Sequence, residues 1–174
     1  MIDEKITFKK INIAVITLSD TRKYHEDKSG KALKEFIFLK GHDLSHYQII
    51  EDEPKIFVPI IEKLTKSIKH DVIITTGGTG LTGRDITVDV LETYFDKKID
   101  GFGELFRFVS YKKIGTSTIQ SRAIAGTKNG KYIFCLPGSP SACKDAWEEI
   151  LKFQLDIRHK PCNFVEIMPR LSET

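Results

Sequence analysis

The stretch TTGGTGLTGRDIT, Thr75 to Thr87, follows an apolar segment at residues 71–74 and precedes a helix-like segment from Val88. Because glycine has no Cβ, its four glycines let backbone N–H groups come close to an anionic ligand. Threonine hydroxyls add donors, Arg84 adds positive charge, and Asp85 adds a carboxylate suited to a hard metal ion. A strand, a glycine-rich loop and a helix start in this order predict a phosphate-binding site.

Two other phosphate-binding motifs fit this loop less well. Gly78 to Gly83 matches G-x-G-x-x-G, but it follows the third predicted strand and lacks the acidic partner of a dinucleotide site. Arg84-Asp85 also stands where a P-loop has Lys and Ser or Thr. A loop in which the glycines only turn the chain is the structural alternative, and it leaves Arg84 and Asp85 unexplained.

Strand and helix signals alternate around the loop. Strands are predicted at residues 11–18, 43–50, 71–75, 123–127 and 132–136, and helices at 29–40, from 54, at 88–95, at 104–111 and at 141–154 with Ser141 as cap. This alternation predicts an α/β protein with a mainly parallel sheet covered on both faces, and Asn129-Gly130 predicts one late antiparallel hairpin. Three loops, starting at Ser19, Thr75 and Pro137, leave strand ends and should face one crevice.

Composition limits the remaining possibilities. The 174 residues predict one domain, 1–174, with terminal extensions at about 1–10 and 161–174, the latter partly extended. A net charge of +3, with scattered basic residues, gives no reason to expect a nucleic-acid or membrane partner. The three cysteines lack paired spacing, and neither a signal peptide nor a membrane-spanning stretch is evident, so we expect a cytoplasmic protein.

The loop TTGGTGLTGRDIT also resembles the molybdopterin-binding proteins of molybdenum cofactor biosynthesis, the MoaB/MogA family. Further segments match the family in order: DKSG (27–30), GFGELFR (101–107) and LPGS (136–139), with IGTSTIQSRA (114–123) and KPCNF (160–164) similar to the MoaB branch. The resemblance implies a three-layer α/β/α sandwich, the molybdopterin-binding fold, that assembles as homotrimers or hexamers. It also admits other cofactor-biosynthesis enzymes as partners.

The resemblance further implies the activity of the family. Active members transfer AMP from ATP to the terminal phosphate of molybdopterin and release pyrophosphate. Attacker and leaving group are both anions, so Mg²⁺ is expected as cofactor. Asp85 is the leading catalytic residue and metal ligand, and Asp52 matches the second acidic position of the family. A helix N-cap just before Pro54 is the structural alternative for Asp52.

Other residues receive binding roles from the same resemblance. Glu104 would accept hydrogen bonds from pterin N–H groups, and Arg122 would pair with a phosphate or form a surface salt bridge. The remaining expected ligands fall into a phosphate loop (Thr76, Gly77, Gly78, Thr79, Gly80), a second anion cradle (Pro137, Gly138, Ser139) and a nucleotide side (Ser19, Asp20, Ser29, Gly30).

Three functions remain open from the sequence. The first is a Mg-ATP-dependent molybdopterin adenylyltransferase, and the second is a molybdopterin carrier without turnover. The third is a stand-alone relative of a nucleotide-processing domain with the same fold. Glu51 and Val88 stand where the family often has Pro; neither change removes a reactive group.

Overall fold

The computed structural model describes residues 1–20 and 23–173. Its centre is a six-stranded sheet in the order β2-β1-β3-β6-β5-β4. The strands are β1 (Asn12–Leu18), β2 (Asp43–Ile50), β3 (Val72–Thr76), β4 (Lys97–Lys98), β5 (Ile124–Lys128) and β6 (Lys131–Leu136). Strands β2, β1, β3 and β6 are parallel, whereas β5 and β4 are antiparallel to their neighbours. The predicted α/β class is therefore confirmed, including the late hairpin.

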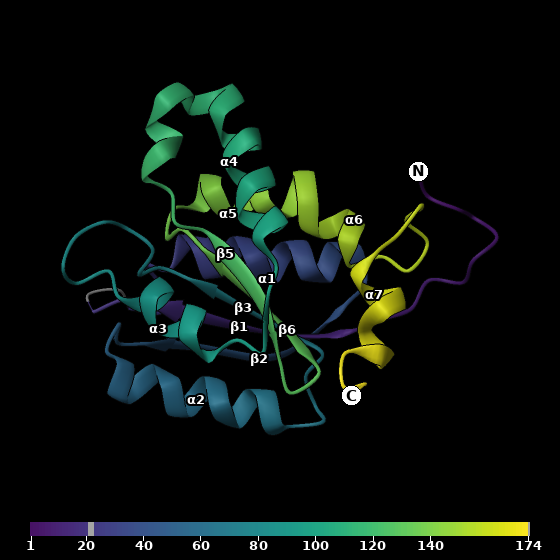
Figure 1. Cartoon of the computed structure of the whole chain (residues 1–174), viewed down its shortest axis with the longest axis horizontal. Coiled ribbons are helices and arrows are strands. Elements are labelled where there is room, and N and C mark those ends of the chain that lie inside the picture. The colour runs from purple at the N-terminus through teal and green to yellow at the C-terminus, as the bar shows by residue number, and fades with distance from the viewer. Residues whose placement is uncertain (21–22, 174) are drawn as a thin grey trace.

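Helices cover both faces of this sheet (Figure 1). They are α1 (Lys28–Lys40), α2 (Pro54–Lys66), α3 (Thr87–Tyr94), α4 (Asp100–Ile114), α5 (Pro140–Ala146), α6 (Lys152–Gln154) and α7 (Phe164–Ile167), with 3-10 segments η1 (Gly115–Gln120) and η3 (Met168–Arg170) and a π-helical turn η2 (Trp147–Leu151). In Figure 1, α2 lies below the sheet, and α1, α4 and α5 lie above it. Helix α3 covers the same face as α2, because its Leu91 packs in one core with Phe57 and Ile61 of α2. The three-layer sandwich expected from the family resemblance is present.

Alternate residues of β1 supply the two cores. Ile13 and Val15 pack with Leu33 of α1 on one face, and Ala14 and Ile16 pack with helix α2 on the other. A strand that is buried on both faces has a nearly continuous apolar sequence. The run INIAVITL, residues 11–18, therefore predicted this strand correctly.

Turn chemistry sets several element boundaries. Gly41 ends α1 with a positive φ of 91°, and Asn129-Gly130 has φ values of 50° and 72°. Positive φ at both central residues is the signature of a two-residue hairpin turn whose twist matches its strands. The predicted helix end and hairpin are both confirmed.

Three sequence predictions need correction, and one short strand was missed. Helix α4 begins at Asp100 rather than Glu104, because Gly101 and Gly103 weaken its helical signal. The last long helical segment is capped by Ser139, not Ser141. Strand β4 was not predicted, since two lysines carry no strand signal. The C-terminal tail is helical over α7 rather than partly extended, because Asn163 caps that turn through the Glu166 N–H.

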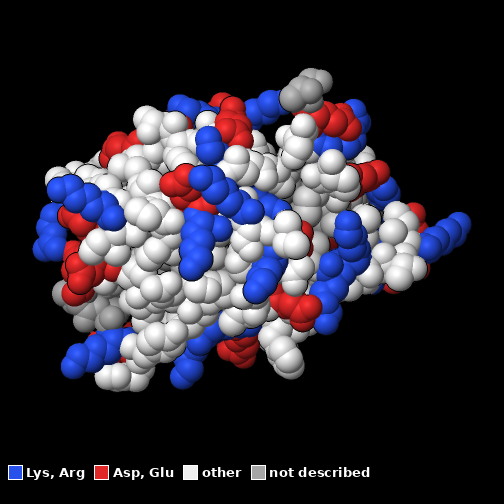
Figure 2. Space-filling view, turned by 90° about the horizontal axis from the view of Figure 1, so that it is seen from below, with Lys and Arg blue, Asp and Glu red and all other residues white. Residues whose placement is uncertain are grey.

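Charge is distributed without a single dominant sign on the face seen in Figure 2, where Lys and Arg are interspersed with Asp and Glu. Among the described residues, no helix combines the length and apolarity required to cross a bilayer.

Candidate functional site

Three strand-end loops meet at one pocket of about 470 Å³. Ser19 follows β1, the glycine loop follows β3, and Pro137 to Ser139 follow β6. These strands are parallel neighbours in the sheet, so their carboxyl ends share one edge. The single crevice expected from the sequence is therefore present.

Close approach explains the glycines at 77 and 78. A Cβ on Gly77, where φ is 115°, would lie 2.1 Å from the carbonyl oxygen of Leu18. On Gly78, where φ is 63°, it would lie 2.1 Å from Thr87 Oγ1 and 2.3 Å from Asp52 Oδ2. No side chain fits at either position, so the glycine-rich loop lies directly against the residues behind it.

Asp52 sits behind Gly78 and is held by two interactions. Its Oδ1 accepts a hydrogen bond of 2.6 Å from Thr87 Oγ1, and its backbone N–H donates to Asp20 Oδ1 at 3.0 Å. Burial raises the pKa of Asp52; the carboxylates of Asp20 and Asp85 add to this rise, and the Thr87 hydrogen bond opposes it. The alternative reading of Asp52 as a helix cap is wrong: the N-cap position of α2 is Glu53, and no side chain caps it.

Asp85 belongs to the glycine-rich stretch itself and lines the pocket. Its Oδ2 accepts from the backbone N–H of Thr82 at 3.0 Å and from Thr82 Oγ1 at 2.6 Å. These hydrogen bonds, that from the Thr82 hydroxyl first, lower the pKa of Asp85 despite partial burial. A Cβ on Gly80 would come within 2.6 Å of Asp85 Oδ2, so this carboxylate also touches the loop.

The donor set around the loop fits a magnesium ion. Mg²⁺ prefers one or two carboxylates completed by phosphate and water oxygens. Asp52 and Asp85 supply hard oxygen donors beside the loop, Asp52 from the neighbouring acidic groove and Asp85 from the strand-end pocket, and the charge of Asp85 raises the pKa of Asp52. A cation between them would relieve this mutual repulsion.

The second loop is joined to the first. Thr76 Oγ1 donates to the carbonyl oxygen of Pro137 at 2.9 Å, so its hydroxyl is committed to tying the loops together. Ser139 Oγ accepts from the backbone N–H of Ala142 at 3.2 Å and caps α5. Gly138 and Ser139 line the same pocket as the glycine loop, and their role as a second anion cradle stays a prediction.

Several expected ligands lie elsewhere. Asp20 forms an ion pair with Arg84 and lines a separate acidic groove with Asp52. Ser29 and Gly30 are buried and donate to Asp27 Oδ1, so neither presents a surface to a nucleotide.

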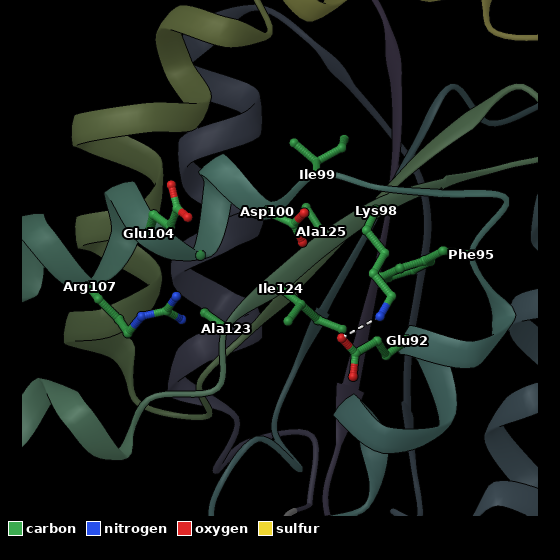
Figure 3. A pocket seen from close by; sticks show the side chains of 11 residues that line it. Glu92, Phe95, Lys98, Ile99, Asp100, Glu104, Arg107, Ala123, Ile124 and Ala125 are labelled. Carbon is green, nitrogen blue, oxygen red and sulfur yellow. Dashed lines mark hydrogen bonds and ion pairs between the residues drawn. The ribbon is translucent and has the colours of Figure 1, made fainter.

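Glu104 lines a different pocket, of about 300 Å³, together with Arg107 and Ala123 (Figure 3). This pocket is lined by residues of α3, α4 and β5, and Figure 3 shows Glu104 on α4, one turn from Arg107. A direct contact between Glu104 and a ligand in the glycine-loop pocket is therefore not supported within one chain.

Arg122 forms the surface salt bridge that the sequence analysis named as one of its two roles. Its guanidinium donates to Asp89 Oδ2 at 2.6 Å and to the backbone carbonyl of Asp85 at 3.3 Å. It therefore ties the exit of the glycine loop to α3.

The sequence reasoning missed the helical wall of the pocket. Phe106, Ser110 and Ile114 of α4 line it, together with Gln120 at the end of η1 and Ser121 directly after it. Their i, i+4 spacing places one face of α4 against the strand-end loops. The segments GFGELFR and IGTSTIQSRA, which carried the family resemblance, contain the signal for this wall.

Fold and site together define the class. A mainly parallel sheet with amide-rich loops at its carboxyl edge is the arrangement in which α/β domains typically place a ligand-binding crevice. Residues 14–157 match the family described as "Probable molybdopterin binding domain".

Two relatives of known name are similar to this chain over most of its length. Molybdenum cofactor biosynthesis protein B of Escherichia coli (strain K12) is 41% identical over 157 residues, covering 90% of this chain and 92% of the relative. The protein of the same name from Staphylococcus epidermidis is 42% identical over 151 residues, covering 84% and 86%.

Solved structures with a similar fold point to the same family. A crystal structure of molybdenum cofactor biosynthesis protein B has a TM-score of 0.82 at 38% identity and covers 84% of this chain and 92% of its own. The tungsten cofactor synthesizing protein MoaB from Pyrococcus furiosus has a TM-score of 0.70 at 37% identity, covering 82% and 91%. The chain belongs to the MoaB/MogA family of molybdenum cofactor biosynthesis proteins, with MoaB proteins as its similar relatives.

Proposed function

We propose that this protein binds molybdopterin in the strand-end pocket and transfers AMP from ATP to the terminal phosphate of that pterin. Its place in molybdenum cofactor biosynthesis follows from its family. The adenylyl transfer is supported by the glycine loop and the two carboxylates beside it.

One observation carries the proposal. Asp52 follows β2 and Asp85 belongs to the glycine-rich stretch after β3, yet the first carboxylate lies against Gly78 and the second against Gly80. A loop that only turned the chain would not need two acidic side chains beside its amides. Adenylyl transfer does need both features, because phosphate oxygens must be held and their charge neutralised.

In the proposed reaction, the loops bind the phosphates and the carboxylates hold the metal ion. Backbone N–H groups of the glycine loop would bind the terminal phosphate of molybdopterin, and the loop at Gly138 and Ser139 would bind a second anionic group. An oxygen of the bound phosphate attacks the α-phosphorus of ATP; the bond to the β-phosphate oxygen breaks, and pyrophosphate leaves with that electron pair. Asp52 and Asp85 would hold Mg²⁺, which when bound neutralises phosphate charge.

A carrier without turnover is the second candidate. The observation in its favour is that Asp85 already accepts two hydrogen bonds from Thr82. A carboxylate used to shape its loop is less available to a metal ion, and the pocket would then bind the pterin without activating ATP.

Anaerobic incubation with molybdopterin and Mg-ATP separates the two functions. The enzyme releases pyrophosphate; the carrier binds the pterin and releases none. Asp85→Asn should lower pyrophosphate release by about 100-fold with little change in pterin affinity. Asp43→Asn is the matched control, because Asp43 begins β2 at the opposite edge of the sheet and pairs with Lys10. Unchanged release in Asp85→Asn removes Asp85 from the mechanism, and a wild-type protein that binds no molybdopterin refutes both functions.

A further inference from the structure

Two histidines meet at a place in the sheet that the strand-end pocket does not use. His46 lies within the edge strand β2, and His70 directly precedes the segment that leads into β3. Their ring centres are 6.2 Å apart, and the ring planes are inclined by 63°. Two imidazoles that share one metal ion at Zn–N distances of 2.0–2.1 Å have ring centres about 5 to 6.5 Å apart, depending on the angle at the metal. The observed separation is compatible with a shared ion.

A β-bulge in β2 brings adjacent residues to the same neighbour. Leu44 and His46 pair with successive residues of β1, so that Ser45 between them is an extra residue in the ladder. In a regular strand, neighbouring side chains point to opposite faces. Here Ser45 Oγ lies 2.8 Å from His70 Nδ1, and the ring of His46 also lies against His70. Bulges commonly re-aim a side chain in this way, and they are frequent at sheet edges.

Each ring has an oxygen partner on one of its two nitrogens. His46 Nε2 lies 3.3 Å from Gln48 Oε1, which can only accept, so Nε2 carries the proton and Nδ1 keeps a lone pair. In the same way, a proton on His70 Nδ1 that is donated to Ser45 Oγ leaves a lone pair on Nε2. Histidines that bind metals usually donate their other ring N–H to an oxygen, which fixes the tautomer and the ring orientation. Both rings have this support.

The protonation of His70 also suits a ligand. Its side chain is buried, at 6% exposure. Burial, and then the charge of His46, lower the pKa of His70; Lys131 and Lys69 add to this effect, and Asp71 opposes it. A neutral imidazole is the form that binds a metal ion, and His70 is therefore in this form at pH 7.

We propose that His46 Nδ1 and His70 Nε2 bind one divalent transition-metal ion of the class that prefers imidazole nitrogen, with Zn²⁺ as its representative. Within residues 1–20 and 23–173, no third His, Cys, Asp or Glu completes a metal-binding group with them, so water fills the remaining positions. Mg²⁺, which prefers oxygen ligands, is not expected here.

The place of the pair in the sheet says what a bound ion would do. Strand β1 lies between β2 and β3, so the ion would link the edge strand to the segment before β3. Because it binds only the folded arrangement of the two rings, it would stabilise the native state. His70 precedes β3, whereas the glycine loop of the pocket follows that strand. The proposed site is therefore independent of the chemistry proposed for the pocket.

Nuclear magnetic resonance tests the site in the unaltered, tag-free chain. Long-range ¹H–¹⁵N spectra resolve the two nitrogens of each imidazole, and one equivalent of Zn²⁺ should shift Nδ1 of His46 and Nε2 of His70. The exposed His25 is the internal control and should not shift. Mg²⁺ should shift neither ring of the pair. The proposal is overturned if excess Zn²⁺ leaves both rings unshifted, or if it coordinates the opposite nitrogens.

Substitutions test the same assignment by affinity. His46→Asn and His70→Asn should each weaken Zn²⁺ binding, measured by calorimetry, by at least about 10-fold, and should abolish the rise in Tm that Zn²⁺ gives the unaltered chain. Ser45→Ala removes only the partner of His70 Nδ1 and should weaken binding less than the loss of either ring.

Two further variants control for other ligands. All titrations use a Cys162→Ser background, because Cys162 is an exposed free thiol that could compete for Zn²⁺. In that background, His25→Asn removes an exposed imidazole outside the pair and should leave the affinity unchanged. Circular dichroism checks that each variant is folded, and the spectra of the unaltered chain decide the question if one is not. Equal Zn²⁺ affinity in the His25, His46 and His70 variants overturns the proposal.

Discussion

Thr87 and Asp52 are separated by 35 residues in the sequence and joined by a hydrogen bond of 2.6 Å between Thr87 Oγ1 and Asp52 Oδ1. Thr87 is fully buried at the start of α3, and Asp52 follows β2. The bond fixes a carboxylate from one side of the sheet against Gly78 of the loop that follows β3. The site therefore depends on a contact between three segments: the one after β2, the loop after β3 and the start of α3.

Removing this hydroxyl should destabilise the protein. Thr87→Val keeps the shape and removes the donor, so we expect a loss of about 1–3 kcal/mol in the free energy of unfolding, measured with urea at pH 7. Thr87→Ser retains the donor and should lose less. The bond lowers the pKa of Asp52 against burial, so the loss should shrink as the pH falls through that pKa. Equal stability of the valine and serine variants would contradict this account.

The glycine at position 78 should tolerate no side chain. Gly78→Ala puts a Cβ within 2.3 Å of Asp52 Oδ2 at a φ of 63°, so we expect a loss of more than about 2 kcal/mol and of molybdopterin binding. Gly83→Ala is the control in the same loop, because a Cβ there meets nothing within 4 Å. Calorimetry and ligand titration of both variants check the difference, and similar behaviour of the two refutes it.

Acid sensitivity should include a contribution from His42. Burial, and then the charge of Lys40, lower the pKa of His42 to about 4, while the unfolded chain has an ordinary value of about 6.5. Between these values the unfolded state binds more protons, so the free energy of unfolding should fall as the pH drops from about 6.5 to about 4.

A substitution isolates that contribution. His42 Nδ1 accepts the Ile11 N–H at 3.4 Å, and His42→Asn keeps an acceptor without a titrating group. The difference in unfolding free energy between wild type and variant should vary with pH only inside this window. A constant difference from pH 7 to pH 4 would show that His42 is not the group responsible.

Ser139 rather than Ser141 should control the start of α5. Ser139→Ala removes the acceptor for the Ala142 N–H and should cost about 1 kcal/mol. It should also weaken phosphate binding, since Ser139 lines the pocket. Ser141→Ala is the neighbouring control, and a larger loss for it than for Ser139→Ala would reverse the assignment of the cap.

Local patterns predicted most of the architecture. The range 43–50 was predicted as a strand, and β2 occupies Asp43–Ile50. Gly41, Pro54 and Asn129-Gly130 marked boundaries because each has backbone preferences that act over one or two residues. Strand β4 and the start of α4 were not predicted, because their residues have weak local preferences. Strand β4 forms through its pairing with β5.

The candidate site was predictable in part. The three strand-end loops were expected to face one crevice, because parallel strands share an edge, and they do. Glu104 and Ser29 were assigned from motif position alone; Glu104 lies at another pocket and Ser29 is buried beside Asp27. A motif names its residues but does not say which way each side chain points.

The sequence by itself determined the alternation of strands and helices, the glycine loop and the acidic residues beside it, because hydrophobic period and turn chemistry act between near neighbours. Only the tertiary structure decided that Asp52 reaches Gly78 through Thr87, and that α4 turns one face to the pocket and another to solvent. Those contacts depend on strand order and on how helices pack across the sheet, and they join residues that no local pattern connects.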